Sequence, residues 1–391
     1  MKVAVVGQGY VGLPLAIAAA QAGHDVVGID TNIELVESLS RGKSPTGDLS
    51  DEQISKVTKS GRYKASSSYS SVQDCEIVII CVPTPLNHWH EPDLTILESA
   101  LHSITEKLKD GTLVILESTV SPGTTRGFVA NVLKLANVNY DLSYSPERID
   151  PANVKWNVTN TPKLVAGIDE KSINRALNFY NSFISMVIPG TSLEVVETAK
   201  LLENSFRLIN ISFINEMAEF CSKMKIDVRE VIEAAATKPY GFMPFFPTAG
   251  VGGHCIPIDP IYLAHKAKQI GAGTEFIDLA NRINLSMPLR FVELAHEFIG
   301  NLKNKNILVV GVAYKPGVVD VRESPAAPLV DALRKAGAKV SWNDDFVKVW
   351  QGEHSTKLTN SFDLAILVNP HNETNLSLLG NTPILNTRGG Y

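Results

Sequence analysis

A glycine-rich segment between a short apolar strand and a helix constrains the fold of this chain most strongly. Lys2–Val6 is an apolar, β-branched run, which is typical of a buried parallel strand. Gly7-Gln8-Gly9-Tyr10-Val11-Gly12 follows, and Leu15–Ala22 then has the pattern of a helix. A second strand, His24–Ile29, ends at Asp30. The order of strand, glycine turn, helix, strand and acid predicts a dinucleotide-binding βαβ unit.

The glycines and the acid of this unit have separate tasks. Gly7 allows a tight turn, Gly9 lets a pyrophosphate approach the backbone at a helix N-terminus, and Gly12 permits close packing of helix on strand. Asp30 can accept hydrogen bonds from an adenosine ribose, and its charge would repel a 2′-phosphate. The segment therefore predicts a nucleotide site that prefers NAD to NADP.

Further apolar segments extend the predicted sheet and end in hydroxyl residues. Glu76–Val82 and Leu113–Leu116 have the pattern of strands, and Thr84, Ser118 and Thr119 follow their carboxyl ends. Ligands of doubly wound sheets bind beyond these ends. The hydroxyls also suit helix caps or turns, and the sequence leaves both roles open.

A long helix is predicted in the middle of the chain. Leu193–Ile226 carries a broad apolar stripe, and Lys200, Asn204 and Arg207 share one face through their spacing. Such a face is commonly solvated, but a lysine and an asparagine are also donors for a developing oxyanion. A helix of this length between two α/β domains also suits a dimer interface.

The segment 250–260 places Cys255 between a glycine-rich turn and Asp259. This cysteine can be a nucleophile if its thiol is shifted towards thiolate, and the aspartate can orient it or activate water. The alternative is a loop with a buried structural cysteine. The aromatic, proline-rich segment 240–247 precedes it and predicts either a core plug or a lid over a ligand.

The C-terminal part of the chain repeats the first βαβ unit. The segment 328–344 aligns without a gap on 14–30, and in both a helix ends at glycine and a strand ends at aspartate. The glycine fingerprint is replaced by a longer loop with Lys315 and Arg322, which can hold phosphates by charge or lie on the surface. The sequence thus predicts two nucleotide-type domains, with the candidate nucleophile between them.

The composition excludes several classes of protein. The chain has 391 residues, of which 44% are hydrophobic and 20% charged, with a net charge of −5, as in an ordinary globular protein of two or three domains. We expect no nucleic-acid partner without a basic stripe, and no membrane span without a run of about 18 apolar residues. The four cysteines show neither metal-site nor disulfide spacing, which fits a reducing cytoplasm and no metal.

Several ordered motifs resemble those of the UDP-glucose/GDP-mannose dehydrogenase family, and together they span essentially the whole chain. They are GQGYVG at 7–12, CVPTP at 81–85, ESTVSPGT at 117–124, SPER at 145–148, ETAKLLEN at 197–204, GGHCIPID at 252–259 and YKPGVVDVRES at 314–324. Within the family, TKPYGFMPFF followed by GVGGHCIPIDPIYL looks most like the UDP-N-acetylglucosamine 6-dehydrogenase branch.

The resemblance implies oxidation of C6 of a nucleotide sugar from alcohol to carboxylate, with reduction of two NAD⁺. Cys255 would form a thiohemiacetal with the C6 aldehyde and then a thioester. Lys200 and Asn204 would stabilise the oxyanion, with Lys200 also assisting proton removal, and Asp259 would assist proton transfer or position water. Thioester hydrolysis would depend on two further residues, Glu147 and Thr119.

The resemblance also implies binding residues, domains and partners. The NAD site would be formed by Gly7, Gly9, Tyr10, Val11, Gly12, Asp30, Thr84, Thr119 and Arg322. The UDP-sugar site would be formed by Glu147, Arg148, Lys200, Asn204, Tyr240, Phe245, Gly252, Lys315 and Arg388. We expect an NAD-binding Rossmann-like domain at 1–190, a central helical domain for dimerisation and the cysteine loop at 191–298, and a UDP-sugar-binding Rossmann-like domain at 299–391. The expected protein is a cytoplasmic homodimer that makes a precursor of surface polysaccharide.

Alternatives remain for the substrate and for the reaction. UDP-N-acetylglucosamine is the first choice, and UDP-N-acetylmannosamine or UDP-glucose are the alternatives. A single-step NAD dehydrogenase of the 3-hydroxyacid type also pairs a Rossmann domain with helices, and a non-catalytic nucleotide sensor would retain the fold. The C-terminal domain is short for the family, and no basic residue closely follows Asp30, unlike in many relatives.

Overall fold

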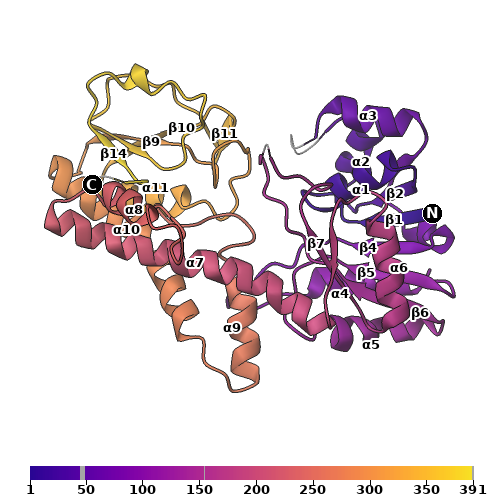
Figure 1. The fold of residues 1–391 in the computed structure, drawn as a ribbon. Coiled ribbons are helices and arrows are strands. Elements are labelled where there is room, and N and C mark those ends of the chain that lie inside the picture. Colours follow the sequence, from indigo (N-terminus) through magenta and orange to yellow (C-terminus); the bar gives the residue numbers. More distant parts are fainter. Residues whose placement is uncertain (45–48, 154, 390–391) are drawn as a thin grey trace. The chain divides into compact units, whose positions relative to one another are not determined.

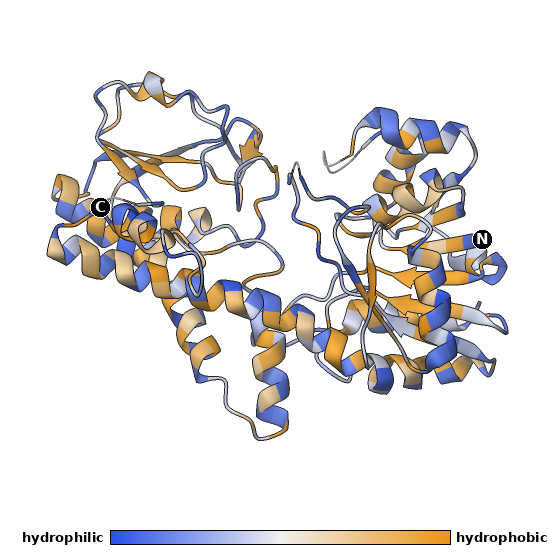
Figure 2. Ribbon diagram, in the orientation of Figure 1, coloured by the Kyte–Doolittle hydropathy of each residue, from blue (hydrophilic) through white to orange (hydrophobic). Residues whose placement is uncertain are grey.

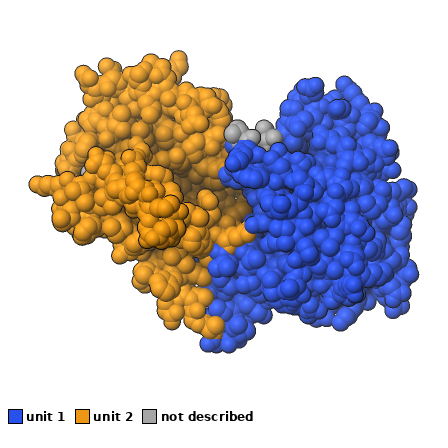
Figure 3. Space-filling view, in the orientation of Figure 1, with its two compact units in different colours: residues 1–202, 261–271 blue, residues 203–260, 272–391 orange. Residues whose placement is uncertain are grey.

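The computed structural model describes residues 1–44, 49–153 and 155–389, and the chain divides into two compact units. Unit 1 comprises residues 1–202 and 261–271, and unit 2 comprises residues 203–260 and 272–391 (Figure 3). Among the described residues, no helix combines the length and apolar character that a membrane span requires.

Unit 1 is built around a sheet that, in its described part, has eight strands in the order β3-β2-β1-β4-β5-β6-β7-β8 (Figure 1). The strands are β1 (Lys2–Val6), β2 (Asp25–Ile29), β3 (Tyr63–Ser66), β4 (Ile77–Ile80), β5 (Thr112–Leu116), β6 (Tyr140–Tyr144), β7 (Lys163–Gly167) and β8 (Val187–Pro189). Neighbouring strands are parallel except β6 and β7. The chain reverses its direction of winding between β1 and β4, where such sheets bind nucleotides.

Unit 1 also contains helices, and all of them except the last in the chain connect its strands. They are α1 (Gly12–Gln21), α2 (Ile33–Ser40), α3 (Asp51–Lys59), α4 (Thr95–Thr105), α5 (Ala130–Leu133), α6 (Glu170–Tyr180) and α9 (Asp259–Gln269), with the short helical segments η1 (Tyr69–Asp74), η2 (Thr125–Val129) and η3 (Lys134–Ala136). Local sequence explains some of their ends, because Asn32 caps α2 and Ser50 and Gln53 form a capping box at α3. The sheet strands are strongly apolar (Figure 2), and β4 and β5 are buried throughout.

Unit 2 contains a parallel sheet that, within the described residues, has four strands in the order β10-β9-β13-β14. Its elements are α8 (Val228–Ala236), α10 (Glu275–Ile299), β9 (Asn306–Val310), α11 (Ala326–Lys335), β10 (Lys339–Asn343), the hairpin strands β11 (Val349–Trp350) and β12 (Glu353–His354), β13 (Leu364–Leu367), η4 (Leu376–Leu379) and β14 (Ile384–Asn386). The unit β9-α11-β10 repeats β1-α1-β2, which confirms the predicted half-copy. The predicted long helix is also confirmed as α7 (Leu193–Met224), which begins in unit 1 and ends in unit 2.

A buried polar cluster lies at the carboxyl end of β5. The Nζ of Lys163 lies 3.0 Å from Oε2 of Glu117, and their side chains are 7% and 0% exposed. The hydroxyl of Tyr180 donates to the other carboxylate oxygen, and Lys163 lies over the Tyr180 ring. Burial raises the pKa of Glu117, and the Lys163 charge opposes that rise. The charge of Lys163 therefore stabilises the ionised form of the buried Glu117 carboxylate. The Nζ of Lys163 also lies 3.5 Å from the carbonyl oxygen of Pro146.

We predict that Lys163→Met lowers the free energy of unfolding by about 3 kcal/mol at pH 7, because Glu117 is left buried without its cation. Without the lysine, the folded-state pKa of Glu117 rises further above its unfolded value. The folded state then binds more protons than the unfolded state, so stability falls as the pH rises above the unfolded pKa of about 4.3. Urea titrations at pH 5 and pH 8 measure this.

Two variants control the experiment. Lys43→Met breaks an exposed pair with Asp51, so its free energy of unfolding should stay close to that of the wild type. Replacing both partners, Lys163→Met with Glu117→Leu, should restore much of the stability. A Lys163→Met protein as stable as the wild type at pH 8 would contradict the argument.

Candidate functional site

The glycine loop after β1 has a shape that requires glycine at two positions. Gly7 has a φ of +91°, and a Cβ on it would lie 2.7 Å from the carbonyl oxygen of Cys81. A Cβ on Gly12 would lie 1.9 Å from the carbonyl oxygen of Gly7. Among the described residues, nothing lies within 4 Å of the corresponding position on Gly9. The backbone at Gly9 is therefore open to a ligand, as the sequence predicts.

The carboxylate of Asp30 holds this loop from the end of the neighbouring strand. Its oxygens accept hydrogen bonds from the backbone N–H of Gln8 at 2.8 Å and of Asn32 at 2.9 Å. The buried Gln8 side chain donates to the carbonyl of Val5 and accepts from the Tyr63 hydroxyl, each at 2.8 Å. The sequence analysis missed Gln8 and Tyr63, because Gln8 occupies a variable position of the fingerprint and only the fold brings Tyr63 to it.

These features fit NAD. Gly9 offers open backbone immediately before α1, where N–H groups at a helix N-terminus can bind a pyrophosphate. Tyr10 and Val11 complete the loop and are half-buried. Asp30 is also half-buried, so its carboxylate remains accessible to a ribose.

The predicted strand-end threonines meet. The Thr84 hydroxyl donates to the carbonyl of Thr119 at 2.7 Å, and the Tyr262 hydroxyl donates to the carbonyl of Thr84 at 3.0 Å. The Thr84 side chain therefore ties two loops at the carboxyl edge of the sheet. This contact supports the turn role, one of the two that the sequence left open for this hydroxyl.

A buried glutamate missed by the sequence analysis braces the next loop. Glu197 on α7 accepts hydrogen bonds from the N–H groups of Gly123 at 2.6 Å and Thr125 at 2.9 Å. Burial raises its pKa, and the Thr125 and Gly123 hydrogen bonds oppose the rise. Its place in the segment ETAKLLEN, three residues before Lys200, was the available signal.

Glu147 and Lys200, two predicted catalytic residues, are joined in unit 1. The ammonium group of Lys200 donates to the backbone carbonyl of Glu147 at 2.5 Å. The Glu147 carboxylate accepts from the N–H groups of Arg148 and Ile149, and Arg148 donates to the carbonyl of Pro162 at 2.9 Å. A small pocket opens beside these residues, with Glu147, Arg148 and Lys163 in its lining. The contact therefore joins the Lys200 side chain to the backbone of Glu147.

Asn204, one turn after Lys200 on α7, contacts the predicted Asp259. Its amide Nδ2 donates to Oδ2 of Asp259 at 2.5 Å, and both side chains are buried. Lys200 is buried as well, whereas Arg207 is exposed. Of the three residues predicted to share one face of the helix, Arg207 is therefore exposed to solvent, whereas Lys200 and Asn204 are not.

Cys255 lies on an exposed turn before α9, so the alternative of a buried structural cysteine is wrong. Its carbonyl accepts from the N–H groups of Ile258 at 3.2 Å and Asp259 at 2.9 Å. A Cβ on Gly252 would lie 2.5 Å from the carbonyl oxygen of Glu323, so this turn requires glycine there. The structure thereby places an accessible thiol four residues from the Asp259–Asn204 pair.

Four predicted ligand-binding residues lie elsewhere in unit 2. Tyr240 is exposed and Phe245 is half-buried against Phe206, so the aromatic segment is not a core plug at Tyr240. Lys315 lies on the loop after β9, and Arg322 pairs with Asp320 at 2.6 Å.

Arg388, after β14, is the fifth ligand-binding residue predicted in this unit apart from the cysteine turn. It donates to Oδ1 of Asn369 at 3.0 Å. Burial lowers its pKa, and the charge of Arg229 adds to the effect. Two neighbouring guanidinium groups, one of them largely desolvated, suit a phosphate ligand.

Comparison with known proteins gives the following matches. Three profiles of the UDP-glucose/GDP-mannose dehydrogenase family match: the NAD binding domain at residues 1–184, the central domain at 194–286 and the UDP binding domain at 308–378. A UDP-N-acetyl-D-mannosamine dehydrogenase of Pyrococcus horikoshii is 34% identical, over 95% of this chain and 90% of the relative. A UDP-N-acetyl-D-glucosamine 6-dehydrogenase of Salmonella typhi is also 34% identical, over 89% and 83%.

A solved structure is also similar. The UDP-D-ManNAc dehydrogenase structure from Pyrococcus horikoshii superposes with a TM-score of 0.91 at 32% identity, covering 99% of this chain and 95% of the other. This chain is therefore similar to that protein in both sequence and fold over nearly its full length.

We predict that Asp30 makes the protein prefer NAD⁺ to NADP⁺. Asp30→Asn keeps an acceptor for the Gln8 N–H and removes the charge, so kcat/KM for NADP⁺ should rise about tenfold. Asp25→Asn, at the exposed start of β2, should leave the ratio unchanged. Equal kcat/KM for the two cofactors in the wild type would contradict this role.

Proposed function

The chain belongs to the UDP-glucose/GDP-mannose dehydrogenase family and is an NAD-dependent oxidoreductase, and from this premise we propose that it oxidises C6 of a UDP-N-acetylhexosamine from alcohol to carboxylate in two steps. The observation that carries the proposal is the exposed Cys255, four residues from a buried Asp259 that accepts a hydrogen bond from Asn204. A simple alcohol dehydrogenase needs no such nucleophile, whereas a four-electron oxidation needs one to hold the aldehyde.

The reaction assigns a role to each residue. Loss of a hydride and a proton from the C6 alcohol gives an aldehyde, and Lys200 assists the departure of the proton. The Cys255 thiolate adds to the aldehyde carbon, and Lys200 and Asn204 stabilise the oxyanion. Loss of a second hydride turns this thiohemiacetal into a thioester. Water, positioned by Asp259, Thr119 and Glu147, cleaves the thioester to a carboxylate and regenerates the thiol.

NAD⁺, when bound by the Gly7–Gly12 loop and Asp30, accepts a hydride in each oxidation. The buried environment of Lys200 and Asn204 supports their assignment, because donors act more strongly on a developing charge in a site from which water is excluded. We retain the assignment of residues 1–190 to NAD binding, 191–298 to the central helical domain and 299–391 to the UDP-sugar, and the three family matches support it.

Two UDP-sugars are candidate substrates, and a third is included for testing. UDP-N-acetylglucosamine is favoured by the segment from Thr237 to Phe246 with the cysteine turn, and a relative from Salmonella typhi acts on this sugar according to its name. UDP-N-acetylmannosamine is the second candidate, because a relative from Pyrococcus horikoshii carries that name and its structure is similar. UDP-glucose is the third sugar to be tested.

We predict two NADH per sugar with one of these UDP-sugars at saturating NAD⁺. The measurement is absorbance at a limiting amount of each sugar nucleotide, with the uronate product quantified by mass spectrometry. One NADH per sugar, with an aldehyde or ketone product, would contradict the thioester route and revive the single-step alternative. Binding of NAD without turnover of any UDP-sugar would instead favour the nucleotide sensor.

Cys255→Ala should reduce uronate formation on the order of 10³-fold or more, because the variant cannot form the thioester. Cys221→Ala is the matched control, since Cys221 is buried in α7 in the same unit and has no assigned role. A Cys255→Ala enzyme that forms uronate at the wild-type rate would refute the proposal.

We also propose that α7 forms a homodimer interface. One stripe of this helix carries exposed apolar side chains at helical spacing: Val195, Leu202, Phe206, Phe213, Phe220 and Met224. These residues are 44–61% exposed in the single chain. Exposed aromatic and aliphatic groups aligned in this way are typical of a surface that another protein chain covers.

A double substitution, Phe213→Glu with Phe220→Glu, should convert the dimer into a monomer, because it places charge in the apolar stripe. Size-exclusion chromatography with light scattering gives the mass of the wild type and the variant. Asp331→Ala, at an exposed residue of α11, is the control. A wild-type protein with the mass of one chain would refute the interface.

A further inference from the structure

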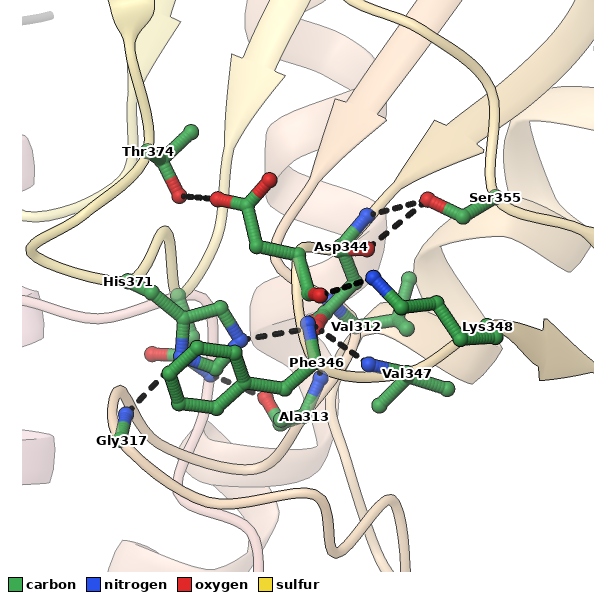
Figure 4. Close-up of polar contacts among 12 residues, drawn as sticks. Val312, Ala313, Gly317, Asp344, Phe346, Val347, Lys348, Ser355, His371 and Thr374 are labelled. Atoms are coloured by element: carbon green, nitrogen blue, oxygen red, sulfur yellow. Dashed lines mark hydrogen bonds and ion pairs between the residues drawn. The ribbon is translucent and has the colours of Figure 1, made fainter.

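Asp344 is the counterpart of Asp30 in the C-terminal repeat, and it is closed to ligands. Its side chain is fully buried after β10. One carboxylate oxygen accepts from the N–H groups of Val312 at 2.9 Å and Ala313 at 3.2 Å. The other accepts from the N–H groups of Phe346 and Val347, each at 2.9 Å (Figure 4). Both oxygens of this carboxylate accept hydrogen bonds from backbone N–H groups of the protein, so Asp344 has a structural role in the C-terminal repeat.

His371 links this carboxylate to a loop. Its Nε2 lies 2.7 Å from Oδ1 of Asp344, and its Nδ1 accepts a hydrogen bond from the N–H of Gly317 at 2.9 Å. An acceptor at Nδ1 places the ring hydrogen on Nε2, where it is donated to Asp344. The Phe346 ring stacks on the imidazole, with centroids 4.1 Å apart (Figure 4).

The pair is also favourable electrostatically. Burial raises the pKa of Asp344, but the hydrogen bonds from His371, Val347 and Phe346 outweigh burial, and the net pKa is lowered. The carboxylate is thus ionised and holds the imidazole in one orientation. The hydrogen bond from Nε2 to Asp344 thereby fixes the position of Nδ1, which accepts from the N–H of Gly317.

The loop that His371 holds carries Lys315, two residues before Gly317. Asn369, two residues before His371, donates from Nδ2 to the carbonyls of Ala313 and Tyr314, each at 3.0 Å. The backbone is therefore fastened on both sides of Lys315, at 313–314 by Asn369 and at 317 by His371. The same Asn369 accepts from Arg388. One short segment after β13 thus supports two cations of the predicted UDP-sugar site, Lys315 and Arg388.

We propose that His371 positions the Tyr314–Gly317 turn so that the Lys315 ammonium group meets the diphosphate of the nucleotide sugar. The inference rests on the proposed function, in which Lys315 contacts the UDP-sugar. His371 is a positioning residue, because its fully buried side chain acts through the Gly317 backbone and not on the substrate.

Two substitutions separate this role from a purely structural one. His371→Gln retains a donor at the position of Nε2 for Asp344 and loses the acceptor near Gly317. His371→Asn retains an acceptor at the position of Nδ1 for Gly317 and loses the donor to Asp344. A structural role predicts that the asparagine variant is the more impaired, because the buried Asp344 loses a partner. The positioning role predicts the opposite order for substrate binding.

The test measures KM for the UDP-sugar, KM for NAD⁺, kcat and the melting temperature. We expect His371→Gln to raise the KM for the UDP-sugar about tenfold, which is the scale of one hydrogen bond, with kcat and the KM for NAD⁺ within about twofold of wild type. His371→Asn should keep a near wild-type KM but melt at a lower temperature. His354→Gln, at an exposed histidine of β12, should change none of them.

Coupling to Lys315 completes the test. In a Lys315→Met background, His371→Gln should raise the KM no further, because both changes remove the same contact. An unchanged KM in His371→Gln, a larger KM rise in His371→Asn, or additive effects would each overturn the inference. So would an unchanged KM in Lys315→Met alone.

Failure of the proposed function gives a different result. A wild-type enzyme that oxidises no UDP-sugar refutes that function and leaves positioning to be decided by calorimetry with UDP. There, weaker binding by His371→Gln than by His371→Asn supports positioning, and equal or reversed affinities overturn it.

Discussion

A carboxylate at the end of one strand, bound to backbone N–H groups at the end of its neighbour, is the constraint on which both βαβ units depend. Asp30 accepts from the Gln8 N–H, and Asp344 accepts from those of Val312 and Ala313. In parallel strands these groups meet at the same edge, so the contact fixes the loop on which a nucleotide can bind. The two βαβ segments differ in whether the carboxylate can also bind a ligand. Asp30 is half-buried, whereas Asp344 accepts further hydrogen bonds from donors within the protein.

The helix α7 provides the second constraint. Its hydrogen-bonded backbone fixes Lys200 and Asn204 one turn apart, whatever the flanking loops do. Each side chain then finds a different partner: Lys200 the Glu147 carbonyl, and Asn204 the Asp259 carboxylate. Glu197, one turn earlier, holds the loop after β5. A single helix therefore orders backbone and side chains that lie far apart in the sequence, and rigid elements of this kind position catalytic groups better than loops do.

Much of the fold followed from local patterns. The strand β1, the glycine loop, α7 and the repeat β9-α11-β10 were predicted because their signals are contiguous: apolar runs, helical periodicity and residues required by a turn. The exposure of Cys255 and the burial of Lys200 were not predictable from composition, since both residue types occur inside and outside proteins. The sequence analysis left each of these as a pair of alternatives.

By itself the sequence determined the family, the order of the elements and the identity of the reactive groups, because these are properties of spacing along the chain. Only the tertiary structure decided which groups meet. Gln8 with Tyr63, Glu117 with Lys163, and His371 with Asp344 are separated by 55, 46 and 27 residues. Their pairing depends on strand order and on burial. In a desolvated interior a polar group must find a partner, and the fold determines which partner is within reach.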